Sequence, residues 1–333
     1  MDSLIAHFND LIAFMQQTLF EGLIQPVMFA LGLAVWIEDA YNATEIFLYG
    51  IFEIALLYAV LRPLEALFPL EHWTNRKAIR VDVIYTLLDR LGILPLFMFA
   101  LLLPVETGLD EWLRMQGYVP YDLERLAPTL ANNPLASFFI YLLLLDLAEY
   151  WRHRLSHYFN AWWELHAVHH SQQQLSFWSD SRNHLLDTVT ANLWFTVIAL
   201  LIGVQPSQFI GLILLTRLLQ SFSHANLRVS FGWLGERLLV SPHYHRLHHA
   251  IGIGHEGVHR GCNFAVLFPV WDVLFGTANF SPEFPATGVR SQVGKAGETG
   301  RDYGAGFWAQ QRLGLQRMWA ALKLGVGLGK SPH

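Results

Sequence analysis

Long apolar stretches recur along this chain and constrain its fold more than any other feature. Each holds about 15 to 18 residues, and six can be recognised: 22–37, 45–61, 91–105, 134–150, 190–204 and 206–222. A helix that crosses a bilayer upright needs roughly 20 apolar residues, so flanking aromatic and polar residues must lengthen some of these stretches. The pattern predicts a bundle of membrane helices.

The composition agrees with a lipid environment. Of the 333 residues, 53% are hydrophobic and 15% are charged, against about 25% charged in an ordinary soluble domain. Strand-like alternation is absent from the chain, which favours helices throughout. We therefore expect an all-α integral membrane helical bundle of about four to six transmembrane or hairpin helices. The last two stretches would form the hairpin, reversing in a tight turn from Gly203 to Gln208.

The distribution of lysine and arginine predicts the orientation of the bundle. Segment 62–90 contains five of these residues, whereas segment 106–133 contains two beside five acids. Loops rich in Lys and Arg stay on the cytoplasmic side, so segment 62–90 is expected there. The crossings at 91–105 and 134–150 would then return the chain to the cytoplasm after Tyr150. Residues 1–61 contain no Lys or Arg and so lack the basic region of a signal peptide.

Three parts are expected along the chain. Residues 1–61 would form N-terminal membrane helices, and residues 62–281 a histidine-rich membrane domain. Residues 282–333 would form a cytoplasmic loop followed by an amphipathic helix, Phe307 to Leu324, on the membrane surface. The net charge of −5 predicts no broad basic surface for nucleic acid.

The chain has 16 histidines and a single cysteine, Cys262. One cysteine excludes an internal disulfide, a CxxC redox pair and a cysteine-ligated iron–sulfur cluster. Thirteen of the histidines fall between His153 and His259. A bound metal would therefore be held by imidazole nitrogen.

Eight of these histidines form three short motifs, one HxxxH and two HxxHH: His153/His157, His166/His169/His170 and His245/His248/His249. Histidines three or four residues apart lie on one face of a helix and can converge on one ion. Eight imidazoles exceed the ligand number of a single ion, so two metals are expected. Nitrogen ligands without cysteine suit iron, zinc or copper, and composition leaves the choice among these open.

Two carboxylates precede the first motif on the same helical stripe as His153. Asp146 and Glu149 are placed to hydrogen-bond a ligating imidazole, which would fix its tautomer and raise its basicity. Since both lie near the cytoplasmic end of an apolar stretch, water could satisfy them instead.

The motifs resemble those of the fatty acid hydroxylase and sterol desaturase superfamily. The resemblance rests on the three histidine motifs in order, followed by Asn263-Phe and by Trp271-Asp272-Val-Leu-Phe275-Gly276-Thr277. It covers about residues 60 to 310, and the spacing is similar to the branch with alkylglycerol monooxygenases and bacterial ornithine-lipid hydroxylases. It implies an integral membrane enzyme with a histidine-ligated di-iron centre, and residues 62–281 as its hydroxylase domain.

The resemblance also implies roles for residues outside the three motifs. His224 matches a histidine of relatives and is expected to bind metal, whereas His184 matches a histidine of some branches only and has an open role. Asp187, Asp272 and Asn263 join Asp146 and Glu149 as residues expected around the ligands. His243, His255 and His259 are expected on loops or at a pocket rim, and no role is assigned to His7, His72 and His333.

The implied activity is O2-dependent hydroxylation of a membrane lipid, with two iron ions as cofactor. Desaturation at the same centre is the first alternative, and a non-catalytic protein that binds or transports metal is the second. A haem-binding His-Pro-Gly-Gly element and a flavin or Rossmann fingerprint are absent from the sequence, so an external electron donor is expected. The location would be a bacterial inner membrane, or the endoplasmic reticulum membrane in a eukaryote.

Overall fold

The computed structural model describes residues 2–118, 127–202, 206–294 and 299–324. Helices account for the regular structure of these residues, which form no strand beyond two isolated bridges. The all-α prediction is thus confirmed for the described part of the chain. The helices are α1 Asp2–Leu19, η1 Phe20–Ile24, α2 Gln25–Ala30, η2 Ala34–Trp36, α3 Ile37–Leu67, α4 Arg76–Arg90, α5 Ile93–Met115, α7 Pro128–Ala131, α8 Pro134–Tyr158, α9 Asn160–His170, α10 Leu185–Ile202, α11 Pro206–Ser223, α12 Gly232–Gly235, α13 Pro242–His248, α14 Val270–Leu274, η3 Arg290–Gln292 and α15 Phe307–Lys323.

Four segments are long and apolar enough to cross a membrane: Ala34–Leu67, Ile93–Met115, Pro134–Tyr158 and Leu185–Ile202. A shorter apolar helix, Gly211–Ser223, lies in α11. The four segments overlap the apolar stretches around residues 45–61, 91–105, 134–150 and 190–204. The turn predicted from Gly203 to Gln208 begins at residues 203–205, which lie outside the described part.

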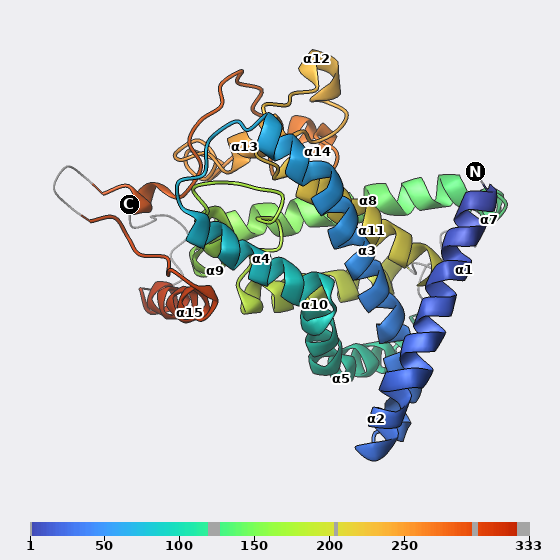
Figure 1. Ribbon diagram of the computed structural model, residues 1–333. Helices are drawn as coiled ribbons and strands as arrows, with labels where there is room; N and C mark the ends of the chain where they lie inside the picture. The colour runs from blue at the N-terminus through green and yellow to red at the C-terminus, as the bar shows by residue number, and fades with distance from the viewer. Residues whose placement is uncertain (1, 119–126, 203–205, 295–298, 325–333) are drawn as a thin grey trace.

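The first apolar stretch, 22–37, does not form one helix. Gly32, between α2 and η2, has a φ of +71°, a left-handed conformation that glycine adopts without steric cost. After α2 the chain turns back into α3 (Figure 1). The α1 helix then packs along α3, where Gln16 donates to the carbonyl of Tyr41 at 2.9 Å and Phe8 contacts Phe52.

A buried ion-pair network joins α3, α4 and α11. The Arg90 guanidinium, 2% exposed, lies 2.5 Å from Glu53 and 2.6 Å from Asp180. Ser221 of α11 donates to the same Asp180 carboxylate at 2.6 Å. The helices α3 and α4 also approach each other closely: a Cβ on Gly50 of α3 would lie 1.7 Å from the carbonyl oxygen of Arg90 in α4. Only glycine fits there.

The C-terminal helix α15 lies against α9, as Figure 1 shows. Its extent agrees with the helix predicted from Phe307 to Leu324. Trp308 and Trp319 are 76% and 58% exposed, whereas Gln311 and Arg317 are buried against the protein. The helix therefore has an aromatic outer face and braces the helix that carries the second histidine motif.

Candidate metal centre

Four neighbouring elements bring nine buried histidines together. The end of α8 carries the first motif, α9 the second, and α13 with the residue after it the third, while His224 follows the end of α11. In Figure 1, α8 runs toward α9, and α13 lies close to that end. The nine side chains are at most 7% exposed: His153, His157, His166, His169, His170, His224, His245, His248 and His249.

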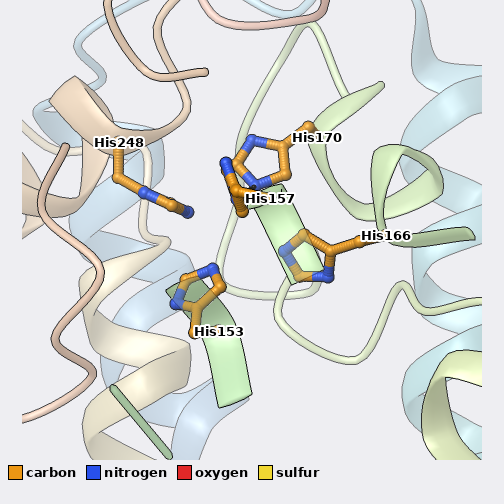
Figure 2. Close-up of side chains that lie close together, drawn as sticks. All are labelled: His153, His157, His166, His170 and His248. Atoms are coloured by element: carbon orange, nitrogen blue, oxygen red, sulfur yellow. Dashed lines mark hydrogen bonds between the residues drawn. The ribbon is translucent and has the colours of Figure 1, made fainter. Parts of the chain in front are cut away.

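The first group of five histidines surrounds one central space (Figure 2). One ring nitrogen from each lies within 4.8 Å of all the others. Four of these rings keep a buried nitrogen without a hydrogen-bond partner, as expected of ligand atoms. The group consists of His153, His157, His166, His170 and His248. The four rings with an unpartnered nitrogen are His153, His166, His170 and His248.

The second group contains His169, His224, His245 and His249. The Nε2 atom of His224 lies 3.3 Å from Nε2 of His169 and 3.0 Å from Nε2 of His245. The groups adjoin, since the rings of His170 and His249 stack with centroids 4.5 Å apart. The structure thus contains two adjacent groups of imidazole nitrogens, and each group could hold a metal ion.

The protonation of six rings follows from their partners. Each places Nδ1 at 2.8–3.2 Å from an oxygen that only accepts hydrogen bonds, a backbone carbonyl in five cases and a carboxylate in one. A neutral imidazole that donates through Nδ1 keeps a lone pair on Nε2. The pairs are His153 with Phe264, His157 with Arg260, His166 with Asp187, His169 with Arg182, His224 with Gln220 and His248 with Cys262.

These tautomers test whether the site fits a metal. The Nε2 atoms of His169 and His224 face each other at 3.3 Å, and both carry lone pairs because both Nδ1 atoms donate to carbonyls. Two acceptors cannot bond to each other, so a cation between them would remove a repulsion. The donor set therefore fits metal ions held by imidazole nitrogen.

Burial keeps five of the grouped imidazoles neutral. Desolvation, together with neighbouring imidazoles, lowers the pKa of His169, His170, His245 and His249 well below the ordinary 6.5. Burial also lowers the pKa of His248 to about 3. The neutral form, which is the one that binds metal, is thus present at neutral pH before a metal arrives.

Asp187 is the one predicted carboxylate that touches a ligand ring. At the start of α10, it accepts from His166 Nδ1 at 2.9 Å and from Trp162 Nε1 at 2.7 Å. The Arg152 guanidinium lies 3.7 Å away. This carboxylate fixes the tautomer and the orientation of the His166 ring.

Asp146 and Asp272 support the histidine groups indirectly, through the backbone of a neighbouring segment. Asp146 accepts from the backbone N–H groups of Leu267 and Phe268, and Asp272 from those of Phe264 and Ala265, at 2.8–3.0 Å. They shape the segment that offers carbonyl oxygens to His153 and His248. The printed partners of both carboxylates are other groups than histidines, which corrects the expectation that Asp146 would orient His153 directly.

Glu149 and Asn263 also differ from expectation. Glu149 forms two hydrogen bonds to Arg152, at 2.5 and 2.7 Å, because a guanidinium one turn away binds a carboxylate more strongly than a neutral ring does. Asn263 donates to the carbonyls of Tyr244 and Asn279 at a φ of +55°. Its amide supports a turn, rather than pointing at the metal groups.

His184 lies outside both groups. Its Nε2 is 2.8 Å from the carbonyl of Gln311 in α15, and its Nδ1 accepts from Leu186 N–H at 3.1 Å. With both nitrogens bonded to backbone, the ring joins α10 to α15. His243, His255 and His259 also belong to neither group.

A small cavity of about 60 Å³ touches both histidine groups. Imidazoles form part of its wall, and the remainder is mostly polar, with Glu149, Arg152, Asp180, Asn183 and Gln220. The cavity has room for a molecule the size of dioxygen or water beside the ligand atoms. Apart from Glu149, the sequence carried no signal for these wall residues, nor for the five carbonyls that set the histidine tautomers.

Comparison with known proteins identifies the domain around these groups. Residues 138–277 match the fatty acid hydroxylase family model, and eight of the nine grouped histidines lie in the three motifs that the sequence resemblance named. This segment of the chain is thus similar to proteins of the fatty acid hydroxylase superfamily. The matched residues run from α8 to just beyond α14, and so include every histidine of both groups.

Several curated proteins are similar to a part of this chain. The alkylglycerol monooxygenase of Danio rerio is 33% identical over 138 residues, which cover 41% of this chain and 29% of that protein. The human enzyme is 31% identical over 135 residues, 40% of this chain and 28% of its own. A Delta(7)-sterol 5(6)-desaturase of Gibberella zeae is 25% identical over 138 residues, 41% and 40%.

The match thus spans less than a third of the length of these monooxygenases. No solved structure matches the chain.

Replacing Asp187 tests its role beside His166. Asp187→Asn is expected to lower the affinity for iron by about 10- to 100-fold, because a neutral amide holds the His166 ring in place less firmly than a carboxylate does. Competition with a graded series of iron chelators measures this affinity. Glu283→Gln, an exposed acid away from both groups, is the control. Equal chelator midpoints for Asp187→Asn and the unmodified protein would contradict the role.

Proposed function

We propose that this protein is a membrane-bound, di-iron, O2-dependent hydroxylase of a lipid. The observation that carries the proposal is the pair of adjacent buried histidine groups, whose lone pairs converge within a fatty acid hydroxylase domain. Nine histidines would hold the two irons: five in the first group and four in the second. When bound, such a pair supplies the oxidising power that attack on an unactivated C–H bond requires.

The protein's own residues prepare the site for this chemistry. Backbone carbonyls and Asp187 hold six rings with their lone pairs free. The absence of cysteine from both groups avoids a thiolate that an oxidant would attack. The polar cavity beside the groups admits dioxygen, and its Arg152 and Gln220 offer hydrogen-bond donors to the polar end of a substrate.

The four apolar segments support a lipid substrate that arrives from the bilayer. The histidine groups lie at the end of one such segment, α8. The distribution of Lys and Arg predicts that this end faces the cytoplasm, and we propose a bacterial inner membrane as the location. Electrons would come from a separate donor. The relatives named as alkylglycerol monooxygenases support the lipid assignment.

Desaturation is a second candidate, favoured by the similarity to a sterol desaturase. It starts from the same hydrogen abstraction and ends with loss of a second hydrogen. Metal transport receives less support, because ligands for transport would be spread along the membrane helices. Here they gather at helix ends in two buried groups.

Lipid mass spectrometry tests the proposed reaction. Lipids would be extracted from aerobic cells that lack the gene, and from the same cells carrying the intact gene or the His169→Ala variant. We expect a lipid heavier by one oxygen atom with the intact gene only. A product lighter by two hydrogens would establish the desaturase, and identical lipids in all three strains, with a competent electron donor present, would contradict both.

A further inference from the structure

Trp163, in the first turn of α9, contacts the first histidine group from outside. The centroid of its ring lies 4.8 Å from that of His157 and 5.3 Å from that of His170. Unlike the nine grouped histidines, Trp163 is partly exposed. An aromatic side chain thus leads from the ligands toward the outside of the protein.

His255 continues this aromatic contact outward. Its ring stacks on Trp163 with centroids 5.3 Å apart and an interplanar angle of 22°. It lies in the loop after α13, where Ile253 and Val258 are 43% and 96% exposed. Trp163 and His255 together form what we call the aromatic path.

We propose that electrons enter the metal centre through the aromatic path, from a small acidic one-electron carrier protein that docks on the loop containing His255. The proposal rests on the proposed function, in which RH + O2 + 2 e⁻ + 2 H⁺ gives ROH + H2O. The carrier supplies both electrons, one at a time, and water supplies the protons. Because electron transfer weakens steeply with distance, stacked rings that touch two ligand imidazoles offer a short route.

The charges around the loop favour an acidic partner. The Arg260 guanidinium donates to the carbonyl of Tyr158 at 2.5 Å and to the Asn160 side chain at 2.6 Å. Among the described residues it has no carboxylate partner, and so its positive charge is not compensated. Arg290, 61% exposed, is paired with Glu256 beside His255. With Val258 exposed on the same loop, the loop offers an apolar side chain beside the uncompensated positive charge of Arg260.

Reduction of the iron-loaded full-length protein in lipid nanodiscs tests the path. The probe is a reduced plant-type [2Fe–2S] ferredoxin, which is an acidic one-electron carrier, and the rate is followed by stopped-flow absorbance. Trp163→Leu is expected to slow reduction by ferredoxin by an order of magnitude or more, while the iron content stays at the level of the unmodified protein. Dithionite, which needs no docking surface, should reduce both proteins. Trp308→Leu, an exposed tryptophan on α15, is the matched control.

Docking is measured separately on the protein stripped of iron by a chelator, so this readout does not depend on activity. Val258→Glu and Arg260→Glu are expected to weaken ferredoxin binding by about an order of magnitude at low salt, and added salt should weaken it in the unmodified protein. Unchanged binding in both variants would contradict the docking surface.

Three results would each contradict a different proposal: the aromatic path, the protein carrier or the hydroxylase. Reduction of Trp163→Leu by ferredoxin at the unmodified rate would overturn the aromatic path. Reduction by a tetrahydropterin and not by ferredoxin would overturn the protein carrier. Normal reduction by ferredoxin without any lipid product would leave the path standing and contradict the proposed hydroxylase instead.

Discussion

His248→Ala and His169→Ala are each expected to abolish iron binding by one histidine group and, with it, lipid oxidation. Each change removes one of five or four converging nitrogens, and alanine offers no ligand atom in its place. Because the groups adjoin through His170 and His249, loss of one ion should weaken the other. Iron content by plasma emission spectroscopy and product by lipid mass spectrometry should fall together, from two irons per chain to one or none.

Two histidine variants serve as controls. His72 is exposed and belongs to neither group, so His72→Ala should retain both irons and the activity. His184→Ala should also retain both irons, because the His184 nitrogens bond to backbone atoms. The ligand assignment would be wrong if His248→Ala and His169→Ala kept two irons per chain.

Arg90→Met is expected to destabilise the fold by about 3–5 kcal/mol, the usual result of removing one partner from a buried ion pair. Methionine fills a similar volume but leaves Glu53 and Asp180 facing each other in the interior without their common counter-ion. The thermal midpoint in detergent should fall markedly, measured by the loss of soluble protein on heating.

Arg80→Met is the matched control, since Arg80 lies on the same helix, α4, but is exposed. Its thermal midpoint should stay close to that of the unmodified protein. Replacing all three members of the network, Arg90, Glu53 and Asp180, by apolar residues should recover part of the loss. If Arg90→Met and Arg80→Met melted at the same temperature, the network would contribute nothing measurable.

The helical membrane fold was largely predictable because apolar composition is read directly from the residues. The limits of the helices were less predictable, and α3 illustrates why. It continues from Ile37 to Leu67, although the apolar stretch covers only 45–61. Its outer polar residues find partners in the tertiary structure, such as Glu65, which accepts from the backbone N–H groups of Phe177 and Asn226.

The candidate centre shows the same division. Histidine spacing alone predicted eight members of the two groups, and the family resemblance added His224, while His184 could not be distinguished from a ligand. That distinction depends on the carbonyl of Gln311, which lies 127 residues away in the chain and presents no side-chain signal. Similarly, Arg152 competes with His153 for Glu149, which helical periodicity does not reveal.

By itself, the sequence determined the chemistry available to this protein: imidazole ligands without thiolates, in a chain apolar enough for a membrane. Those properties belong to the residues and survive any rearrangement of the chain. The tertiary structure decided which nitrogens face one another, which oxygens hold their tautomers, and that five histidines gather in one group and four in the next. The physical reason is that a metal site depends on distances between residues far apart in sequence, and only packing sets those distances.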